Sequence, residues 1–323
     1  MDWGDYDNDG DLDYLSGKWG ARAILYRNDN GSFSDVQALP DVGNYTSATF
    51  ADYNNDGFLD ILLGVYDGIN KLYLNDGKGN FSQKWSSIES SPTITVAWGD
   101  YDNDGDLDFV ISNYSGPAAT LYRNNGSNNF TKVWDAEVSD IQSWNVNFGD
   151  YNNDGDLDFI LGGNDNSVRL YYNAEAQYNN INSTPTPPGN IKPNYLPYPD
   201  RKFTVTWEPG YDTQTSSSGL YYTVRIATIS NLLNPSSYYT SGVYGTPLFG
   251  AYLRPRTTDN MNKILFDRPQ EETTYYVQIA GIDTGLRRSS WSVEKIYFIP
   301  DTVPPGKVTG VEGWQSTQSN AVK

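Results

Sequence analysis

The chain has 323 residues, with 22 Lys and Arg against 40 Asp and Glu, so its formal net charge is −18. It contains no His and no Cys, which excludes disulfides, thiolate metal sites, Ser-His-Asp catalysis and most transition-metal sites. So acidic a chain would repel a phosphate backbone, so we expect no nucleic-acid partner. No run of about 18 apolar residues is present, so we expect no membrane insertion. The composition is therefore compatible mainly with chemistry that uses oxygen ligands or carboxylates.

A repeat of about 48 residues dominates the first half of the chain. The segment DYDNDGDLDYL at 5–15 recurs with few changes at 52–62, 100–110 and 150–160, and the four starts lie 47, 48 and 50 residues apart. A second motif, Leu-Tyr-x-Asn, places its Tyr 21, 21, 22 and 21 residues after the first Asp of each segment. Distances this constant establish an internal repeat.

Each repeat predicts short β-strands and no helix. Alternating apolar residues precede the acidic segment. After it come a dense apolar run, the Leu-Tyr-x-Asn motif, an Asn/Asp/Gly turn and a last strand. These patterns predict strands at 81–85, 93–98, 107–112, 130–134, 144–148 and 157–162. Four strands at this period predict blades of a β-propeller in an all-β protein. We expect Trp3, Trp98, Trp144 and the motif tyrosines in the cores of the blades.

The acidic segments predict cation sites. In residues 100–108, carboxylates stand at positions 1, 3, 5 and 9, and a Gly at position 6 permits a sharp bend. Seventeen of the 40 acidic residues lie in the four loops, where they repel one another unless a cation lies among them. Position 7 varies and includes Phe58, so its backbone carbonyl would be the ligand. Such oxygen donors suit Ca²⁺, so we expect about four Ca²⁺ ions, the alternative being Asp-rich turns without metal.

The loops are not EF-hands, although their first halves are similar. An EF-hand needs a bidentate Glu at position 12 and a helix on each side. Position 12 here is Ser16, Leu63, Ile111 or Leu161, inside a predicted strand.

Together with the preceding WGDY or FGDY and the following LYRN, the loops resemble FG-GAP/VCBS-type repeats, the calcium-binding propeller blades of integrin α-subunits and many secreted bacterial proteins. The resemblance covers about residues 1–175. It implies side-chain ligands at positions 1, 3, 5 and 9, namely Asp5, Asp7, Asp9, Asp13, Asp52, Asn54, Asp56, Asp60, Asp100, Asp102, Asp104, Asp108, Asp150, Asn152, Asp154 and Asp158. It also implies carbonyl ligands from Asp11, Phe58, Asp106 and Asp156. Such propellers usually have seven blades, so we expect the four present to be incomplete or completed by another chain, in a sequence that begins inside a longer protein.

The rest of the chain predicts a second all-β domain. Residues 176–186 have the Pro/Ser/Asn composition of a semi-rigid linker. Residues 187–300 predict a β-sandwich with strands at 202–207, 221–226, 263–266, 274–282 and 291–298. They resemble a fibronectin type III domain, with Trp207 in an early strand and Tyr275 as a tyrosine corner, which implies a spacer or assembly module. Residues 301–323 predict the Pro-rich lead and first strand of a further sandwich, or an assembly tail.

These features favour a non-catalytic structural or adhesion protein, secreted and extracellular or on the cell surface. Open strand edges at both ends predict end-to-end self-association into a filament or surface layer, or contact with other surface proteins. The alternative is a carbohydrate-binding accessory region of a secreted polysaccharide-acting enzyme, which binds glycans through exposed aromatics such as Trp19 or Tyr66. A carboxylate-pair glycosidase finds little support, because Glu89 and Glu137 are isolated and the loops hold the clustered Asp residues.

Overall fold

The computed structural model describes residues 1–9, 11–29, 31–137, 142–173, 182–197, 201–228, 262–267 and 269–302. These residues form β-strands joined by loops, without a helix, so the predicted all-β class is confirmed. Among them, accordingly, no helix is long and apolar enough to cross a membrane.

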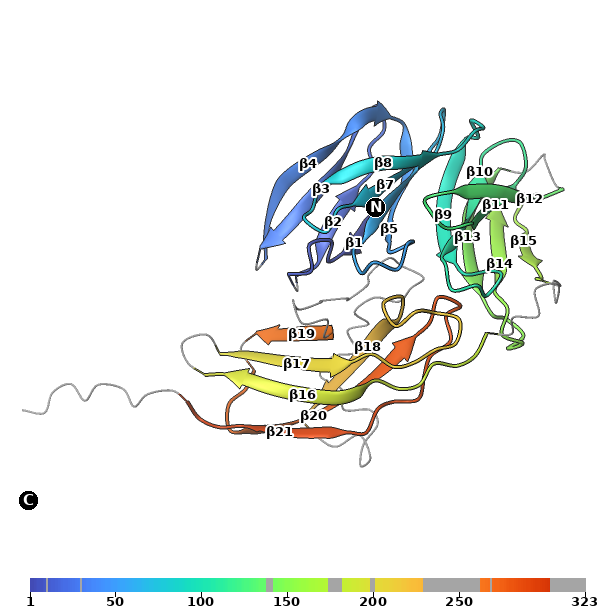
Figure 1. Ribbon diagram of the computed structural model, residues 1–323. Coiled ribbons are helices and arrows are strands. Elements are labelled where there is room, and N and C mark those ends of the chain that lie inside the picture. The colour runs from blue at the N-terminus through green and yellow to red at the C-terminus, as the bar shows by residue number, and fades with distance from the viewer. Residues whose placement is uncertain are drawn as a thin grey trace, which may run out of the picture.

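The repeats form antiparallel sheets whose strands follow one another in chain order (Figure 1), and we call these sheets blades 1 to 4. Blade 1 contains β1 (Asp2–Gly4), β2 (Asp13–Ser16), β3 (Ala21–Asp29) and β4 (Ser32–Gly43). Blade 2 contains β5 (Tyr45–Ala51), β6 (Asp60–Val65), β7 (Lys71–Asn75) and β8 (Phe81–Ser86). Blade 3 contains β9 (Thr93–Gly99), β10 (Asp108–Asn113), β11 (Ala119–Asn124) and β12 (Phe130–Asp135). Blade 4 has three strands in the described part of the chain, β13 (Ser143–Gly149), β14 (Asp158–Gly163) and β15 (Val168–Tyr171).

Neighbouring blades pack through aromatic residues at fixed repeat positions. In blade 3, Phe109 and Tyr122 stack with ring centroids 4.8 Å apart, and Trp85 of blade 2 lies edge-on to both rings. In the next pair, Trp134 of blade 3 lies edge-on to Phe159 and Tyr171 of blade 4. The same contact therefore recurs from one blade to the next, which explains why the Leu-Tyr-x-Asn tyrosines are periodic.

Two of the predicted core tryptophans are exposed. Trp98 is buried as expected, but Trp3 is 46% and Trp144 is 50% exposed, so the prediction was wrong for these two. Trp3 occupies the repeat position of Trp98 on the outer face of blade 1, where the described residues provide no further blade to cover it. Trp144 instead packs edge-on against Tyr114 at the surface.

A β-sandwich follows the blades. One sheet contains β16 (Gly189–Leu196), β17 (Lys202–Glu208) and β19 (Asn262–Asp267), and the other contains β18 (Tyr221–Ala227), β20 (Thr273–Ile282) and β21 (Lys295–Ile299). Residues of both sheets, among them Trp207 and Val277, share one apolar core. The strand predicted at 291–298 begins only at Lys295, whereas Trp291 lies 4.0 Å beneath the guanidinium of Arg225. Most of the predicted linker and tail lie outside the described residues.

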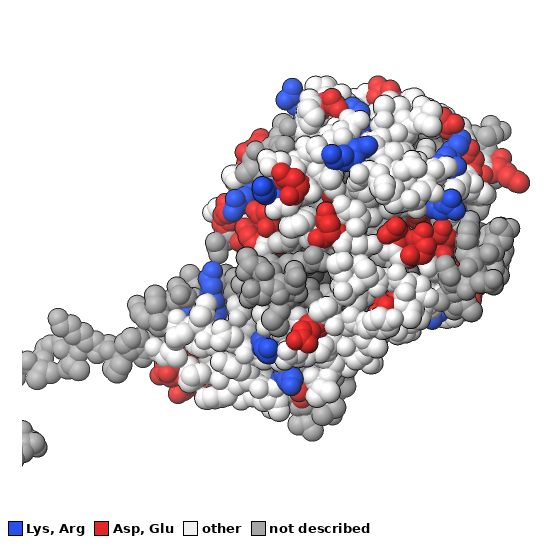
Figure 2. All heavy atoms as spheres, in the orientation of Figure 1, with Lys and Arg blue, Asp and Glu red and all other residues white. Residues whose placement is uncertain are grey.

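The sandwich lies against the edge of the blades that carries the acidic loops (Figure 1). Tyr221 and Ile282 of the sandwich are part of the apolar core of the blades. Figure 2 shows groups of acidic side chains along the part of the blades that borders the sandwich.

Candidate metal centres

We call the acidic segments loop 1 (5–13), loop 2 (52–60), loop 3 (100–108) and loop 4 (150–158). Each connects the first two strands of its blade. In loop 3 the backbone folds around the position-1 carboxylate, because Asp104 N and Gly105 N donate to Asp100 at 3.0 and 2.9 Å. The same two bonds recur in loops 2 and 4. Gly105 has a φ of +96°, a conformation that a residue with a Cβ rarely adopts, so the Gly is required for the bend.

The position-5 carboxylate holds the second half of each loop. It accepts a hydrogen bond from the N–H of position 7, at 2.9 Å from Phe58 to Asp56 and at 3.0 Å in the other three loops. Because the backbone, and not the side chain, makes this bond, Phe fits at position 7 as well as Asp does. Position 7 therefore keeps the same backbone arrangement in all four loops, as expected for a residue that would contribute its carbonyl.

The position-9 carboxylate ties each loop to its blade. Asp108 is buried, and it accepts hydrogen bonds from Asn124 N at 2.7 Å and from Tyr101 N at 3.0 Å. The first of these bonds has equivalents in loops 1, 2 and 4. Position 9 is thus a structural residue as well as a candidate ligand, since a carboxylate oxygen can accept more than one partner.

The Asn that ends the Leu-Tyr-x-Asn motif has a role that was not predicted from the sequence. Asn124 Nδ2 donates to Leu107 O at 3.2 Å in its own loop and to Tyr53 O at 3.0 Å in the preceding blade. Asn75 makes the equivalent pair of bonds, to Leu59 O at 3.1 Å and to Tyr6 O at 2.9 Å. The invariance of this Asn in all four repeats was the available signal.

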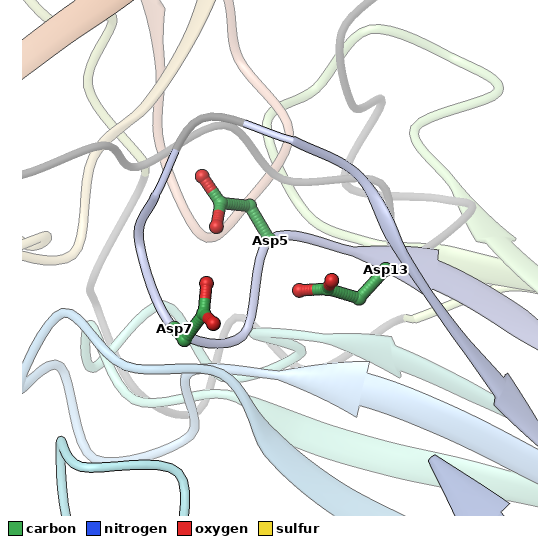
Figure 3. A group of neighbouring side chains, drawn as sticks. All are labelled: Asp5, Asp7 and Asp13. Carbon is green, nitrogen blue, oxygen red and sulfur yellow. The ribbon is translucent and has the colours of Figure 1, made fainter. Parts of the chain in front are cut away.

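Two loops bring carboxylates together as a cation site requires. Ligand oxygens of Asp5, Asp7 and Asp13 lie within 4.8 Å of one another, and Figure 3 shows these side chains around the space that loop 1 encloses. Asp100, Asp102 and Asp104 converge in the same way in loop 3. Loops 2 and 4 have Asn54 and Asn152 at position 3, and the described residues form no such three-carboxylate group there.

The donor set fits a hard cation such as Ca²⁺. Asp102 Oδ1 is buried and has no hydrogen-bond partner. A buried carboxylate oxygen in that state is unfavourable unless a positive charge lies nearby. The positive charge of Arg123 lowers the pKa of Asp102 but offsets only part of the effect of burial, because that pKa still rises to about 6. All side-chain donors are oxygens, which is the ligand type that Ca²⁺ prefers.

The electrostatics of the loops lead to the same conclusion. Loss of hydration raises the pKa of Asp13 to about 7, that of Asp100 to about 8 and that of Asp102 to about 6. Burial also holds the pKa of Asp60 and that of Asp108 well above the usual range. Neighbouring loop carboxylates raise these values further. A bound cation would reverse this effect, because it favours the ionised form of each carboxylate.

The variable residue of Leu-Tyr-x-Asn changes the charge around the loops. In loop 1, Arg27 Nε lies 3.2 Å from Asp7 Oδ2, and Arg27 also pairs with Asp29 at 2.9 Å. In loop 4, Tyr172 Oη donates to Asp154 at 3.3 Å. In blade 2 the equivalent residue is Leu74, which carries no charge. The four loops therefore share one backbone arrangement but differ in local charge.

Among the described residues, the sandwich contacts loops 2, 3 and 4. Its backbone at Gln214 passes so close to Gly105 that a Cβ there would overlap Gln214 O. The Arg287 side chain covers Gly155 in the same way, and its Nη2 lies 4.0 Å from Asp150 Oδ2. Asn55 of loop 2 lies against Gly219.

The repeated blades and their acidic loops define an all-β repeat protein of the β-propeller type. Residues 5–63, 52–111 and 100–161 match the family described as FG-GAP-like repeat, which confirms the FG-GAP resemblance over that part of the chain. No curated protein matches the chain. Among solved structures, the selenomethionine-substituted chicken interferon gamma receptor alpha chain aligns over 90% of this chain and 97% of its own, at 10% identity and a TM-score of 0.25. A similarity that weak carries no argument here.

Proposed function

We propose that this protein is a non-catalytic, extracellular structural or adhesion protein whose blades bind Ca²⁺, about one ion in each acidic loop. The observation that carries the proposal is the convergence of carboxylates in loops 1 and 3, on a backbone arrangement that all four loops share. Asp102 Oδ1, buried without a partner, supports it. The clustered carboxylates would act as ligands and not as a catalytic pair.

Calcium would stabilise a chain that has no disulfides. Extracellular calcium modules bind with a Kd of about 10⁻⁴ to 10⁻³ M. With a Kd near 0.1 mM and roughly 1 to 2 mM free Ca²⁺, each occupied site would add about 1.5 kcal/mol to the free energy of unfolding. Sites this weak would need millimolar Ca²⁺ to be filled, so an extracellular location is part of the proposal.

Calorimetric titration with Ca²⁺, together with thermal unfolding in Ca²⁺ and in EGTA, tests this proposal. We expect binding to several sites and a melting temperature that EGTA lowers sharply. Asp104→Asn removes a position-5 carboxylate and should weaken binding, whereas Asp35→Asn changes the charge equally at an exposed site outside the loops. An unchanged melt in excess EGTA would contradict the proposal.

The sandwich would act as a spacer of the fibronectin type III kind. Two features that the resemblance implied support this assignment. Trp207 is fully buried in β17. Tyr275 Oη accepts a 2.8 Å hydrogen bond from Gln270 N, five residues upstream, which is the contact of a tyrosine corner.

Self-association through blade faces would give the protein its structural role. Ile160 and Leu170 are both 46% exposed on blade 4, although the equivalent Val110 and Leu121 of blade 3 are buried against the next blade. On the outer face of blade 1, Phe33 is 51% exposed, whereas Phe130 at the same position of blade 3 is buried. The two exposed faces are thus the two halves of one blade-to-blade interface. A second copy of the chain could pair with either, head to tail.

Sedimentation velocity in Ca²⁺ over a range of protein concentrations tests this part of the proposal. We expect concentration-dependent association that Ile160→Glu abolishes. Val133→Glu is the matched control, because Val133 is 40% exposed on the edge strand β12 and not on the outer face of blade 4. A monomer at all concentrations would contradict self-association.

One observation favours the second candidate, glycan binding. Trp19, Tyr66, Tyr114 and Trp144, one from each blade, form a row with successive ring centroids 5.2, 5.5 and 5.9 Å apart. The first three follow β2, β6 and β10, at the ends of these strands remote from the acidic loops. Aromatic faces carry partial negative charge and suit the C–H groups of a sugar ring.

Affinity electrophoresis against a panel of polysaccharides tests the second candidate. Trp19→Ala with Trp144→Ala should abolish any retardation. Tyr211→Ala should not, because Tyr211 is 67% exposed on the sandwich, away from the row. If no polysaccharide retards the unmodified protein, this candidate fails.

A further inference from the structure

The Asn at position 4 of each loop bonds to the loop of the following blade. Asn55 Nδ2 donates to Gly105 O at 3.0 Å and to Asp106 Oδ1 at 3.1 Å. Asn103 Nδ2 donates to Gly155 O at 3.4 Å and to Asp156 Oδ1 at 2.7 Å. Asn8 Nδ2 donates to Gly57 O at 3.2 Å. All three junctions between described loops therefore contain the same bond.

The position-4 residues share one backbone conformation and are not candidate ligands of their own loops. All four position-4 residues have a φ between 56° and 59°, in the left-handed region that Asn tolerates better than most residues with a Cβ. The candidate ligands of a loop stand at positions 1, 3, 5, 7 and 9. A position-4 side chain is thus not needed as a ligand by its own loop.

The bond reaches a critical part of the following loop. Position 6 donates its N–H to the position-1 carboxylate, as Gly105 does to Asp100 at 2.9 Å. Position 7 is the residue expected to contribute a carbonyl. The Asn of the preceding loop donates to the carbonyl oxygen of position 6, which belongs to the peptide between these two positions. In two junctions it also donates to the side chain of position 7.

We propose that Asn8, Asn55 and Asn103 are positioning residues for the cation site of the following blade, so that the affinity of each loop depends on the loop before it. This inference rests on the proposed calcium function. Groups that orient metal ligands without touching the metal typically change affinity about 10- to 100-fold when they are lost. We expect an effect of that size in the following loop and none in the loop that carries the substitution.

Calcium titration followed by amide NMR tests the inference one loop at a time. The reporters are the N–H groups of Gly57, Gly105 and Gly155, which donate to position-1 carboxylates at 2.7, 2.9 and 3.1 Å. Asn55→Gly removes the amide and keeps the backbone conformation accessible. It should move the Gly105 midpoint about tenfold higher in Ca²⁺ and leave the Gly57 midpoint unchanged. Asn103→Gly should act in the same way on Gly155, and Asn8→Gly on Gly57.

Asn153→Gly is the matched control. Asn153 has the same φ at the same position, but no further acidic loop follows it in the chain, so none of the three midpoints should move. The inference is wrong if Asn55→Gly shifts the Gly57 midpoint as much as that of Gly105, or if Asn153→Gly acts as strongly as the others. If no glycine amide of the unmodified protein responds to Ca²⁺, the proposed calcium function itself fails.

Discussion

Thr284 Oγ1 donates a hydrogen bond of 2.8 Å to Asp100 Oδ2, and so joins the sandwich to the first carboxylate of loop 3. Both residues are buried, and Asp100 N donates in turn to Thr284 O at 3.3 Å. Thr284 also bonds to Thr215 of the neighbouring sandwich turn, with the two hydroxyl oxygens 2.8 Å apart. A candidate cation loop is therefore also part of the contact between blades and sandwich.

Thr284→Val should weaken that contact. The substitution keeps the shape but leaves Asp100, a buried acid, with one hydrogen bond fewer, at an expected cost of about 1 to 3 kcal/mol in the free energy of unfolding. Urea unfolding measures the loss. Thr206→Val is the control, because the hydroxyl of Thr206 makes only a long bond of 3.5 Å near the surface. Equal effects of the two substitutions would mean that the Thr284 bond adds nothing.

Gly105→Ala should be more harmful than Gly116→Ala. Both residues have a positive φ, +96° and +81°, so both substitutions strain the backbone by about 1 kcal/mol. A Cβ at Gly105 would in addition overlap Gln214 O, whereas no atom lies within 4 Å of the corresponding place at Gly116. Thermal unfolding should show a clearly larger drop for Gly105→Ala, and small-angle scattering should show that the sandwich has moved. Similar melting temperatures would contradict this account.

Arg27→Leu should strengthen cation binding in loop 1. Arg27 pairs with Asp7 and Asp9 at 3.2 and 3.4 Å, and its positive charge repels a cation there. Since the pairs are partly exposed and screened, we expect only a roughly two- to fivefold gain in affinity. Blade 2 already has Leu74 at this position, so the substitution is compatible with the fold. Calorimetric titration measures the gain, and a loss of affinity would show that Arg27 orders the loop instead.

Asp283 should make stability fall as the pH rises. Burial raises the pKa of Asp283 to about 7, and nearby Asp212 contributes to the increase. In the unfolded chain this carboxyl group ionises near pH 4, whereas in the folded chain it stays protonated up to about pH 7. The free energy of unfolding therefore falls as the pH rises from about 4 to 7, by up to about 4 kcal/mol. Asp283→Asn keeps the oxygen that accepts from Arg287 N at 2.7 Å and should reduce this pH dependence. Urea unfolding at pH 5 and pH 8 measures it. The inference fails if the variant and the unmodified protein lose the same stability.

Much of the fold could be predicted because its signals are local or recur at a nearly constant spacing. The spacing of the acidic segments and of Leu-Tyr-x-Asn predicted the repeats, and most predicted strands differ from the observed ones by only one residue at an end, as for residues 93–98 and β9 (Thr93–Gly99). The position-6 Gly was expected to permit a bend, and its φ of +96° in loop 3 agrees.

The errors arose where burial depends on a neighbour in space. Trp3 and Trp98 occupy the same repeat position and look equivalent in the sequence. Trp98 is buried beside Phe109 and Phe130 and against the preceding blade, whereas Trp3 has no blade before it among the described residues. An identical local pattern therefore led to different exposures.

By itself the sequence determined the all-β class, the repeat and the spacing of the carboxylates in the four acidic loops, because strand periodicity and turn residues are local and the acidic segments recur 47, 48 and 50 residues apart. Only the tertiary structure showed that Asn55 bonds to the loop of the next blade and that Thr284 bonds to Asp100. Those contacts join residues 50 and 184 positions apart, and no local pattern encodes which distant groups folding brings together. The charge of the chain thus follows from its composition, but the partners of each carboxylate follow from packing.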